Sequence, residues 1–153
     1  MRLHRISAAI HALTEGEAFS GRGGLFGKGR WHTLGRPIVY TAQHVSLAMA
    51  EALVHIQRSN SLVPFNRWVI DVPDRFIARH PVLPKAWVHD DAIAQPIGDA
   101  WLASNSSPAL LVPSAVVNEE MNCLLNPAHP FFDFKWVVSG PHAFFFVPRP
   151  TRP

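Results

Sequence analysis

The sequence predicts a single domain of the α+β class, in which mixed or antiparallel sheets surround a cleft. Three observations support this prediction. Short apolar or β-branched runs recur along the 153-residue chain, one long segment has helical periodicity, and helices and strands do not alternate as a parallel α/β fold requires. A chain of this length can bury a substantial core as one domain, so we expect a single domain over residues 1–153.

The first third of the chain combines a strand with a glycine-rich loop. Residues 3–6 read as a short strand and residues 7–13 as a turn or short helix. The loop covers residues 19–31, and five glycines fall within residues 21–29. Glycines allow positive φ and let backbone N–H groups approach a ligand. Their spacing matches neither a P-loop nor a dinucleotide fingerprint, so the loop alone identifies no ligand.

A strand over residues 36–41 leads into the long helix, which covers residues 45–56 and is apolar on most sides. We therefore expect this helix to be buried. Glu51 is its only acid, and an ionised carboxylate is costly to bury without a partner. Glu51 has two interpretations: a structural ion pair with Arg30 or Arg58, or a catalytic carboxylate that faces a cleft.

The remaining elements are mostly short strands. We expect, in order, a strand over residues 68–73, loops over 74–95 around a short strand at 86–89, a helix or turn at 98–102, strands at 108–114 and 122–127, a hairpin of strands 134–138 and 142–147 joined by residues 139–141, and an extended proline-rich tail over 148–153.

Three further side chains are candidates for a site, and each also has a structural interpretation. Tyr40 is either a core aromatic with a satisfied hydroxyl or a ring that stacks on a planar ligand. Ser114 ends an apolar strand and can simply cap the turn that follows. Arg5 lies either near the sheet core and cleft or on the surface.

Composition and charge restrict the class of protein. The chain is 48% hydrophobic and 16% charged, and its apolar runs are of strand length, which argues against disorder and against membrane spans. A single cysteine, Cys123, excludes an internal disulfide, and no signal peptide is visible. We expect a soluble cytoplasmic protein with no membrane association.

Positive charge is concentrated in residues 1–40, which hold six lysines and arginines against two glutamates. This predicts an anionic ligand near the glycine-rich loop. A small phosphate-bearing molecule fits best, because one guanidinium can bind two phosphate oxygens. No nucleic-acid recognition motif or long basic stripe is present, so we expect no direct binding to nucleic acid.

Other catalytic chemistries lack their motifs. The nine histidines form no H-E-x-x-H and no Cys/His pairing, so we expect no metal. No G-x-S-x-G surrounds Ser114, and Cys123 lies in an apolar run without a nearby base, so a serine or cysteine hydrolase is not favoured.

Nearly the whole chain resembles the RES-domain family, the toxin component of RES–Xre bacterial type II toxin–antitoxin systems. The motifs that carry the resemblance are, in order, Arg5-Ile6, Gly29-Arg30-Trp31, Gly35, residues 37–42, Ser46-Leu47-Ala48, Glu51, His55, residues 98–102, Val112-Pro113-Ser114, and Asn122 to Pro127 with His129-Pro130. The arginine, glutamate and serine that name the family correspond to Arg30, Glu51 and Ser114. His32 stands where many relatives have asparagine, and residues 146–149 lack an aspartate that often precedes the proline.

The resemblance implies a fold similar to that of the ADP-ribosyltransferase toxins, and NAD as the substrate. Such a toxin degrades NAD by cleaving the nicotinamide–ribose bond, as a glycohydrolase or a phosphorylase. Alternatively it transfers ADP-ribose to a protein, so the acceptor is water, inorganic phosphate or a protein side chain. The implied partner is a cognate Xre-type helix-turn-helix antitoxin in the bacterial cytoplasm. A non-catalytic binding subunit and a nucleic-acid-directed toxin are the remaining alternatives.

The resemblance also implies a role for each candidate residue. Glu51 would stabilise an oxocarbenium-like ribose. Arg30 would hold the pyrophosphate or the ribose, and Tyr40 would stack on nicotinamide. Ser114 would bind the nicotinamide ribose and orient Arg30 or Glu51. Two further NAD-binding candidates are Arg5 and Asn126.

Overall fold

One seven-stranded sheet carries the fold, with the strand order β4-β5-β6-β2-β1-β3-β7. The computed structural model describes residues 1–59, 63–80 and 83–146, without the side chains of residues 55 and 57–59. The strands are β1 (Arg2–Ala8), β2 (Val39–Ala42), β3 (Phe65–Asp71), β4 (Ile77–Arg79), β5 (Ala109–Pro113), β6 (Met121–Leu125) and β7 (Val137–Phe144). β4 pairs parallel to β5, whereas the other pairings of the described strands are antiparallel. The predicted single-domain α+β class with a mixed sheet is confirmed.

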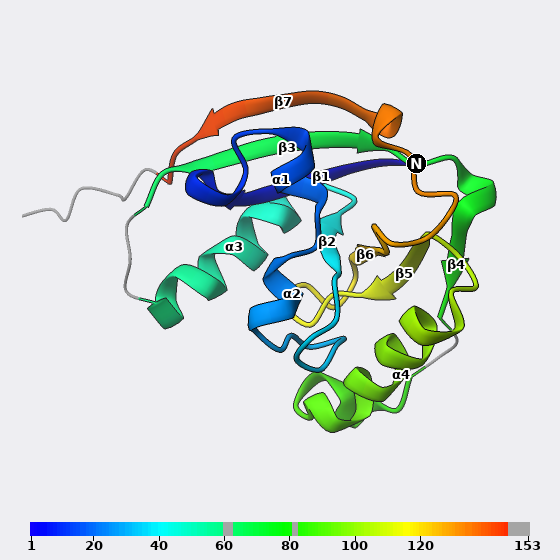
Figure 1. The fold of residues 1–153 in the computed structure, drawn as a ribbon. Helices are drawn as coiled ribbons and strands as arrows, with labels where there is room; N and C mark the ends of the chain where they lie inside the picture. Colours follow the sequence, from blue (N-terminus) through cyan, green and yellow to red (C-terminus); the bar gives the residue numbers. More distant parts are fainter. Residues whose placement is uncertain (60–62, 81–82, 147–153) are drawn as a thin grey trace, which may run out of the picture.

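The sheet changes direction between β1 and β2. β1 pairs with β3 along its whole length, whereas the register of β1 with β2 consists of His4 opposite Ala42. Figure 1 shows the consequence: β1, β3 and β7 run together across the top of the molecule, and β2, β6, β5 and β4 descend away from them. The helix α3 (Val45–Ser59) packs below the first group, and α4 (Asp91–Ser104) lies on the side of β4 and β5.

Strands β5 and β6 are buried on both faces, which explains their continuous apolar sequences. Because side chains alternate along a strand, Leu111 and Cys123 enter one core while Leu110 and Leu124 enter another. Leu3 and Phe19 complete the first core, and three tryptophans, Trp31, Trp87 and Trp101, fill the second. Burial raises the pKa of the Cys123 thiol to about 12, so this thiol stays protonated at neutral pH.

The two long helices differ from the predictions. The expected burial of α3 on most sides was wrong, because Leu47, Ala48 and Ala52 are buried while Met49 is 37% exposed. The assignment of residues 74–95 to loops was also wrong. That segment contains β4, and α4 begins inside it after Asp90, whose carboxylate accepts a hydrogen bond from the backbone N–H of Ala92. The strand predicted at 86–89 is instead the 3-10 helix η3 (Lys85–Val88).

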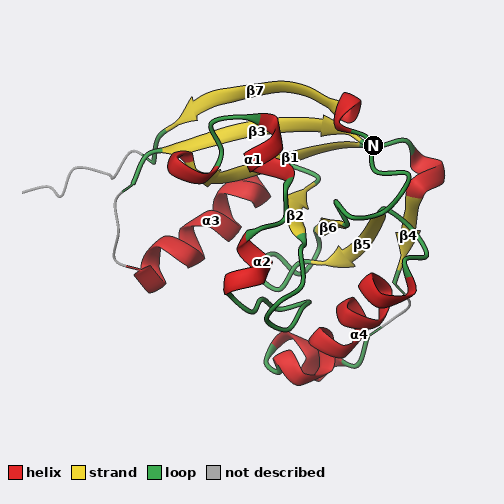
Figure 2. Cartoon of the chain, in the orientation of Figure 1, coloured by secondary structure: helices red, strands yellow, loops and turns green. Residues whose placement is uncertain are grey.

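Short helices occupy several segments between the strands (Figure 2), and one of them forms the beginning of the segment 134–138, where a strand was predicted. Two lie in or beside the glycine-rich loop, namely α1 (Glu15–Phe19) and α2 (Gly23–Phe26), and three others are 3-10 helices, η1 (Ala9–His11), η2 (Asp74–Phe76) and η4 (Phe134–Trp136). A complete capping box between Thr14 and Glu17 begins α1.

The predicted C-terminal hairpin was wrong, because residues 137–144 form one strand that pairs with β3. Ser139-Gly140-Pro141 resembles a turn but lies at an irregularity in the register, opposite Trp68. Gly140 has φ +134°, and a Cβ there would lie 2.5 Å from the Trp68 indole. The glycine thus makes room for a core tryptophan instead of reversing the chain. The predicted tail over 148–153 lies outside the described residues.

Candidate active site

Glu51 is held through one oxygen of its carboxylate. The Ser114 hydroxyl donates to Oε1 at 2.9 Å, and the Asn122 side-chain amide donates to the same oxygen at 2.6 Å. The amide contact is as short as a charge-assisted hydrogen bond, whereas the hydroxyl contact has the ordinary length of an O–H···O hydrogen bond. No described side chain donates to Oε2 of Glu51. The carboxylate is therefore oriented by the protein through one oxygen, and its second oxygen is available to a ligand.

Strands β5 and β6 bring these two donors to Glu51. Ser114 directly follows β5, Asn122 is the second residue of β6, and Val112 lies opposite Asn122 in the ladder. Ser114 is fully buried, and its hydroxyl oxygen accepts from the backbone N–H groups of Val116 and Val117, each at 3.0 Å. Ser114 thus caps the turn, as the structural interpretation expected, and the same hydroxyl directs its hydrogen to Glu51.

The structure does not form an ion pair between Arg30 and Glu51, which was one of the interpretations of this glutamate. Instead, Arg30 Nη1 lies 3.1 Å from a carboxylate oxygen of Asp91, and it donates to the backbone carbonyls of Trp87 at 3.3 Å and Val88 at 3.0 Å. All three contacts use Nη1, and within the described residues no hydrogen bond occupies Nη2 or Nε. The guanidinium is therefore fixed at one corner, with its other donors available. The alternative partner for Glu51, Arg58, has no described side chain.

The helix α4 fixes the loop that carries Arg30. Besides the pair between Asp91 and Arg30, the Gln95 amide donates to the carbonyl of Gly29 at 2.9 Å. One turn later, Asp99 accepts from the backbone N–H and hydroxyl of Thr33, at 3.1 Å and 2.6 Å.

Close packing reinforces these polar contacts. A Cβ at Gly98 would lie 1.8 Å from the Trp31 carbonyl oxygen, so only glycine allows the helix and the loop to approach this closely. Positions 91, 95, 98 and 99 share one face of a helix. Sequence reasoning missed these contacts, although Asp90-Asp91 before an apolar periodic segment was a usable signal for a helix start.

Tyr40 links the glycine-rich loop to the sheet. Its hydroxyl accepts from the backbone N–H of Trp31 at 3.2 Å and lies 2.8 Å from Nδ1 of His32. His32 Nε2 lies 3.0 Å from the Gly27 carbonyl, which can only accept, so Nε2 carries the hydrogen and Nδ1 accepts from Tyr40. The structural interpretation of Tyr40, a satisfied hydroxyl, is therefore correct. Stacking on nicotinamide stays a prediction.

Three charged groups of the site, Asp91, Glu51 and Arg30, influence the pKa of Tyr40. Burial is the main cause that raises the pKa of Tyr40. The negative charges of Asp91 and Glu51 raise this pKa further, whereas the positive charge of Arg30 lowers it. The charges of Glu51 and Arg30 thus act on the same tyrosine in opposite directions, although the two side chains form no ion pair with each other.

Arg5 and Asn126 occupy different surroundings. Arg5 Nη1 donates to the Tyr40 carbonyl at 3.1 Å, and its buried Nε has no hydrogen-bond partner. Burial lowers the pKa of Arg5 to about 10, so the guanidinium remains charged at neutral pH. Asn126 follows the last residue of β6, whereas Asn122 lies near the beginning of that strand. The Asn126 side-chain amide donates to the side-chain oxygen of Asn105, and its side-chain oxygen accepts from the backbone N–H of Ala128. The structure brings Arg5 beneath Tyr40 but does not bring Asn126 to Glu51.

No group of three or more histidine, cysteine, aspartate or glutamate side chains within residues 1–59, 63–80 and 83–146 is arranged to hold a metal ion. Nor does a helix in these ranges combine the length and apolar composition needed to cross a membrane.

Comparison with known proteins decides the family. The model of the RES domain matches residues 2–145. The chain belongs to the RES-domain family. This RES-domain protein is 42% identical to the "Toxin Res" of Yersinia enterocolitica over 125 residues, covering 79% of this chain and 82% of the relative. It is 38% identical to the "Prs ADP-ribosylating toxin" of a Sphingobium species over 125 residues, covering 76% of each chain.

A solved structure supports the fold of the RES-domain protein. The crystal structure of the M. tuberculosis MbcT–MbcA toxin–antitoxin complex matches with a TM-score of 0.61 and 21% sequence identity, covering 81% of this chain and 72% of that chain. At this level of identity the likeness concerns the fold alone.

Proposed function

We propose that this RES-domain protein is the toxin of a bacterial toxin–antitoxin system and that it degrades NAD by cleaving the nicotinamide–ribose bond. Family membership and relatives named as toxins support the first part. One observation carries the second part. Glu51 is oriented through Oε1 by Ser114 and Asn122, and no described side chain donates to Oε2.

The chemistry of the bond explains why a carboxylate suits this position. When the C–N bond breaks, both of its electrons stay with the nicotinamide nitrogen, which loses its positive charge without needing a proton. Positive charge develops on the ribose at the same time, as in other glycosidic cleavages. A fixed carboxylate oxygen beside the sugar stabilises that charge, and Oε2 of Glu51 is the candidate.

Two arginines, Arg30 and Arg5, are the candidates for binding the negatively charged part of NAD. Arg30 would bind the diphosphate of NAD through Nη2 and Nε, because a guanidinium offers two parallel donors to a pair of phosphate oxygens. Asp91 holds its Nη1 and thereby sets the direction of the other donors. Arg5, a partly buried cation whose Nε has no described partner, is a second candidate for a substrate anion. Tyr40 would stack against nicotinamide.

The acceptor of the ribosyl group defines the alternatives. Water and inorganic phosphate give a glycohydrolase and a phosphorylase. A protein acceptor makes the chain an ADP-ribosyltransferase, and the relative named "Prs ADP-ribosylating toxin" favours this second candidate. The connected Glu51, Ser114 and Asn122 cluster argues against a non-catalytic binding subunit. A nucleic-acid-directed toxin would use the basic N-terminal third, but gains nothing from a carboxylate fixed in this way.

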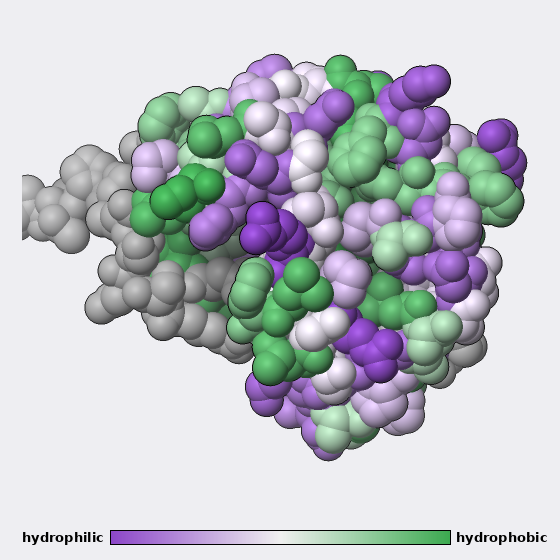
Figure 3. Space-filling model, in the orientation of Figure 1, coloured by the Kyte–Doolittle hydropathy of each residue, from purple (hydrophilic) through white to green (hydrophobic). Residues whose placement is uncertain are grey.

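The proposed partner is a cognate antitoxin of the Xre type that covers the loop around Arg30. Three side chains on this loop expose apolar surface, namely Leu25 (40%), Phe26 (77%) and Leu34 (65%). The backbone N–H of Gly35 bonds to the carbonyl of Gly24, which brings the two ends of this patch together. Figure 3 shows apolar side chains gathered over α2. Exposed patches with a charged rim, here Arg22 and Lys28, are typical of protein interfaces.

The test measures nicotinamide release from NAD by purified protein, with and without inorganic phosphate and with cell extract as a source of protein acceptors. We expect wild type to release nicotinamide and Glu51→Gln to lose most of that activity, because a neutral amide cannot stabilise the ribosyl cation. Glu119→Gln is the matched control, since Glu119 is an exposed acid in the turn after Ser114. No release from wild type under any of these conditions would refute the proposed reaction.

A further inference from the structure

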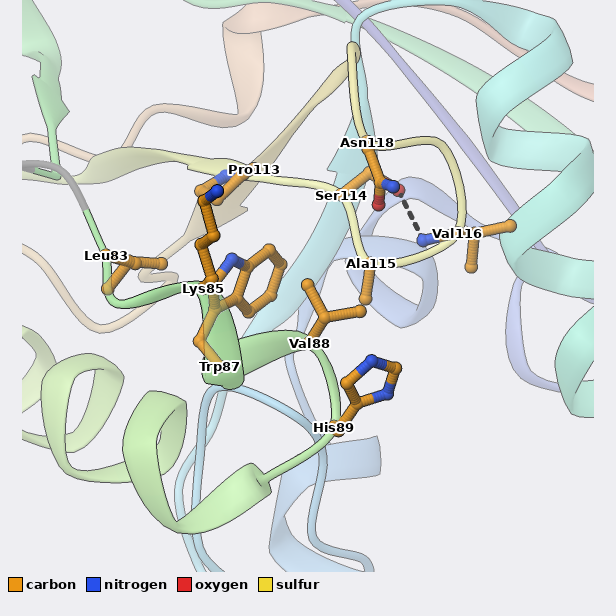
Figure 4. A pocket seen from close by; sticks show the side chains of 10 residues that line it. All are labelled: Leu83, Lys85, Trp87, Val88, His89, Pro113, Ser114, Ala115, Val116 and Asn118. Carbon is orange, nitrogen blue, oxygen red and sulfur yellow. Dashed lines mark hydrogen bonds between the residues drawn. The ribbon is translucent and has the colours of Figure 1, made fainter.

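Arg30 and Glu51 are bonded to opposite walls of one cavity, whose volume is about 520 Å³. Trp87 and Val88 line the first wall, and their backbone carbonyls accept from Nη1 of Arg30. Ser114, which donates to Glu51, lines the second wall. Figure 4 shows Trp87 and Val88 on one side of this space and Ser114 on the other. The position of Arg30 therefore sets where the cation stands relative to the carboxylate across the cavity.

The guanidinium of Arg30 has to be held in place, because an arginine side chain has many rotamers and loses entropy when it is fixed. The two carbonyls of η3 hold Nη1 alone, and they carry no full charge. A group that already has its bound position before the substrate arrives orients that substrate at a lower entropic cost. Residues that complete the hold on Arg30 are therefore candidates for a role in the reaction.

The first two turns of α4 complete this hold at both ends of Arg30. A carboxylate oxygen of Asp91 lies 3.1 Å from Nη1. Gln95, one turn later on the same face of the helix, donates through its side-chain amide to the carbonyl of Gly29 at 2.9 Å. That carbonyl belongs to the peptide that joins Gly29 to Arg30. Asp91 thus fixes the guanidinium, and Gln95 fixes the backbone from which the side chain extends.

Stability alone does not explain the presence of Asp91. Its side chain is 48% exposed, and exposed ion pairs contribute little to the free energy of folding. Asp90 caps α4, so the cap of the helix does not depend on Asp91. A negative charge beside Arg30 also weakens the attraction of this arginine for an anion. The contact therefore fits a residue that orients Arg30 better than one that strengthens anion binding.

We propose that Asp91 and Gln95 are positioning residues, which act on the reaction through Arg30 and do not touch the substrate. The inference rests on the proposed function, in which Arg30 binds the diphosphate of NAD and Glu51 faces the ribose. Because α4 fixes Nη1 and the backbone, Nη2 and Nε of Arg30 keep one direction, and the diphosphate that they bind keeps the ribose at Glu51. Without Asp91 the cation still attracts the diphosphate, but in several orientations.

The test measures kcat and KM for NAD cleavage in Asp91→Asn and Gln95→Met. We expect kcat to fall about tenfold or more in Asp91→Asn, while KM rises by less than about twofold or decreases, because binding persists and orientation is lost. Gln95→Met, which keeps the length of the side chain but cannot donate, should also lower kcat more than it raises KM. Asp91→Glu retains the negative charge and should keep more activity than Asp91→Asn.

Asp90→Asn is the matched control for the loss of charge. It removes an equal charge one residue away, and asparagine is as good an N-cap as aspartate. This variant should keep the kcat and KM of wild type. The urea unfolding midpoint of Asp91→Asn should match that of wild type, because the ion pair is exposed. Equal losses of activity in Asp90→Asn and Asp91→Asn, or a loss that appears only in KM, would overturn the proposal.

NMR supplies a second measurement, which does not depend on NAD cleavage. Rotation about the Nε–Cζ bond of Arg30 should be slow in wild type, where a carboxylate and two carbonyls hold Nη1. It should become faster in Asp91→Asn but not in Asp90→Asn. Equal rotation rates in wild type and Asp91→Asn would contradict the proposal even if NAD is cleaved. A wild type that cleaves no NAD would refute the proposed function, and the rotation rate would still decide whether Asp91 fixes Arg30.

Discussion

Replacing Asn122 by alanine tests the claim that Glu51 is oriented from one side. The substitution removes a 2.6 Å hydrogen bond to a carboxylate at a residue that is 7% exposed. Hydrogen bonds to charged groups contribute about 1.5–3 kcal/mol. If this energy serves to orient Glu51 in the transition state, NAD cleavage falls between roughly 10-fold and roughly 150-fold, since about 1.4 kcal/mol corresponds to a tenfold change in rate. We expect the fall to appear mainly in kcat.

A double-mutant cycle in urea unfolding separates this contact from general damage. Asn122→Ala should cost about 1.5–3 kcal/mol of stability in wild type, and less than about 1 kcal/mol when Glu51 is already alanine. Asn66→Ala is the matched control, because its buried amide donates to the neutral Ala12 carbonyl at 3.1 Å. Its cost should be equal in both backgrounds, and NAD cleavage should persist. An Asn122→Ala cost that is the same with and without Glu51 would refute the reasoning.

Two further predictions concern the glycine-rich loop. Phe26→Asp should weaken antitoxin binding about tenfold or more in calorimetry without loss of NAD cleavage, because it places a charge in the exposed apolar patch. Phe145 is comparably exposed (72%, against 77% for Phe26), and Phe145→Asp should leave antitoxin binding unchanged. Equal effects of the two substitutions on antitoxin binding would contradict the assigned surface. Burial lowers the pKa of His32 below its ordinary value of 6.5, and a second proton would displace the hydrogen bond from Tyr40. The unfolded chain therefore takes up the proton first, so the stability due to His32 is complete above pH 6.5 and declines as pH falls from there toward the folded-state pKa. Urea unfolding between about pH 5 and about pH 7.5 should show a smaller pH dependence in His32→Asn, and an unchanged dependence would contradict this assignment.

Most strands were predictable because the central residues of each strand form a short apolar or alternating run in the sequence. Alternation and β-branched runs located β2, β5 and β6 to within a few residues, and the lone acid in an apolar helix identified Glu51. The approach of Ser114 to Glu51 was also expected, as one of two partners that the serine might orient. Asn122 was missed as a donor, although a polar residue on a strand face that otherwise carries buried Leu124 was a signal for a buried polar partner.

The wrong predictions share a physical cause. In each case contacts between segments distant in the sequence determined a structure that the local sequence did not specify. Pro96 and Gly98 weaken the helical pattern of α4, yet the helix forms because its small residue packs on the Trp31 carbonyl and its acids bind the loop. Ser139-Gly140-Pro141 has the composition of a turn, but pairing with β3 and the bulk of Trp68 keep it in a strand. The ion pair of Arg30 with Asp91 spans 61 positions and has no local signature.

The contact between Gly98 and Trp31 has a consequence for building hybrids of related proteins. Because a Cβ at position 98 would lie 1.8 Å from the Trp31 carbonyl, the loop over residues 29–33 and the helix face over residues 91–99 fit each other with no spare volume. The two segments lie far apart in the sequence, yet we expect that a hybrid can exchange them only together. A chimera that exchanges the loop alone combines two surfaces shaped for other partners, whereas one that exchanges the loop together with α4 preserves the fit.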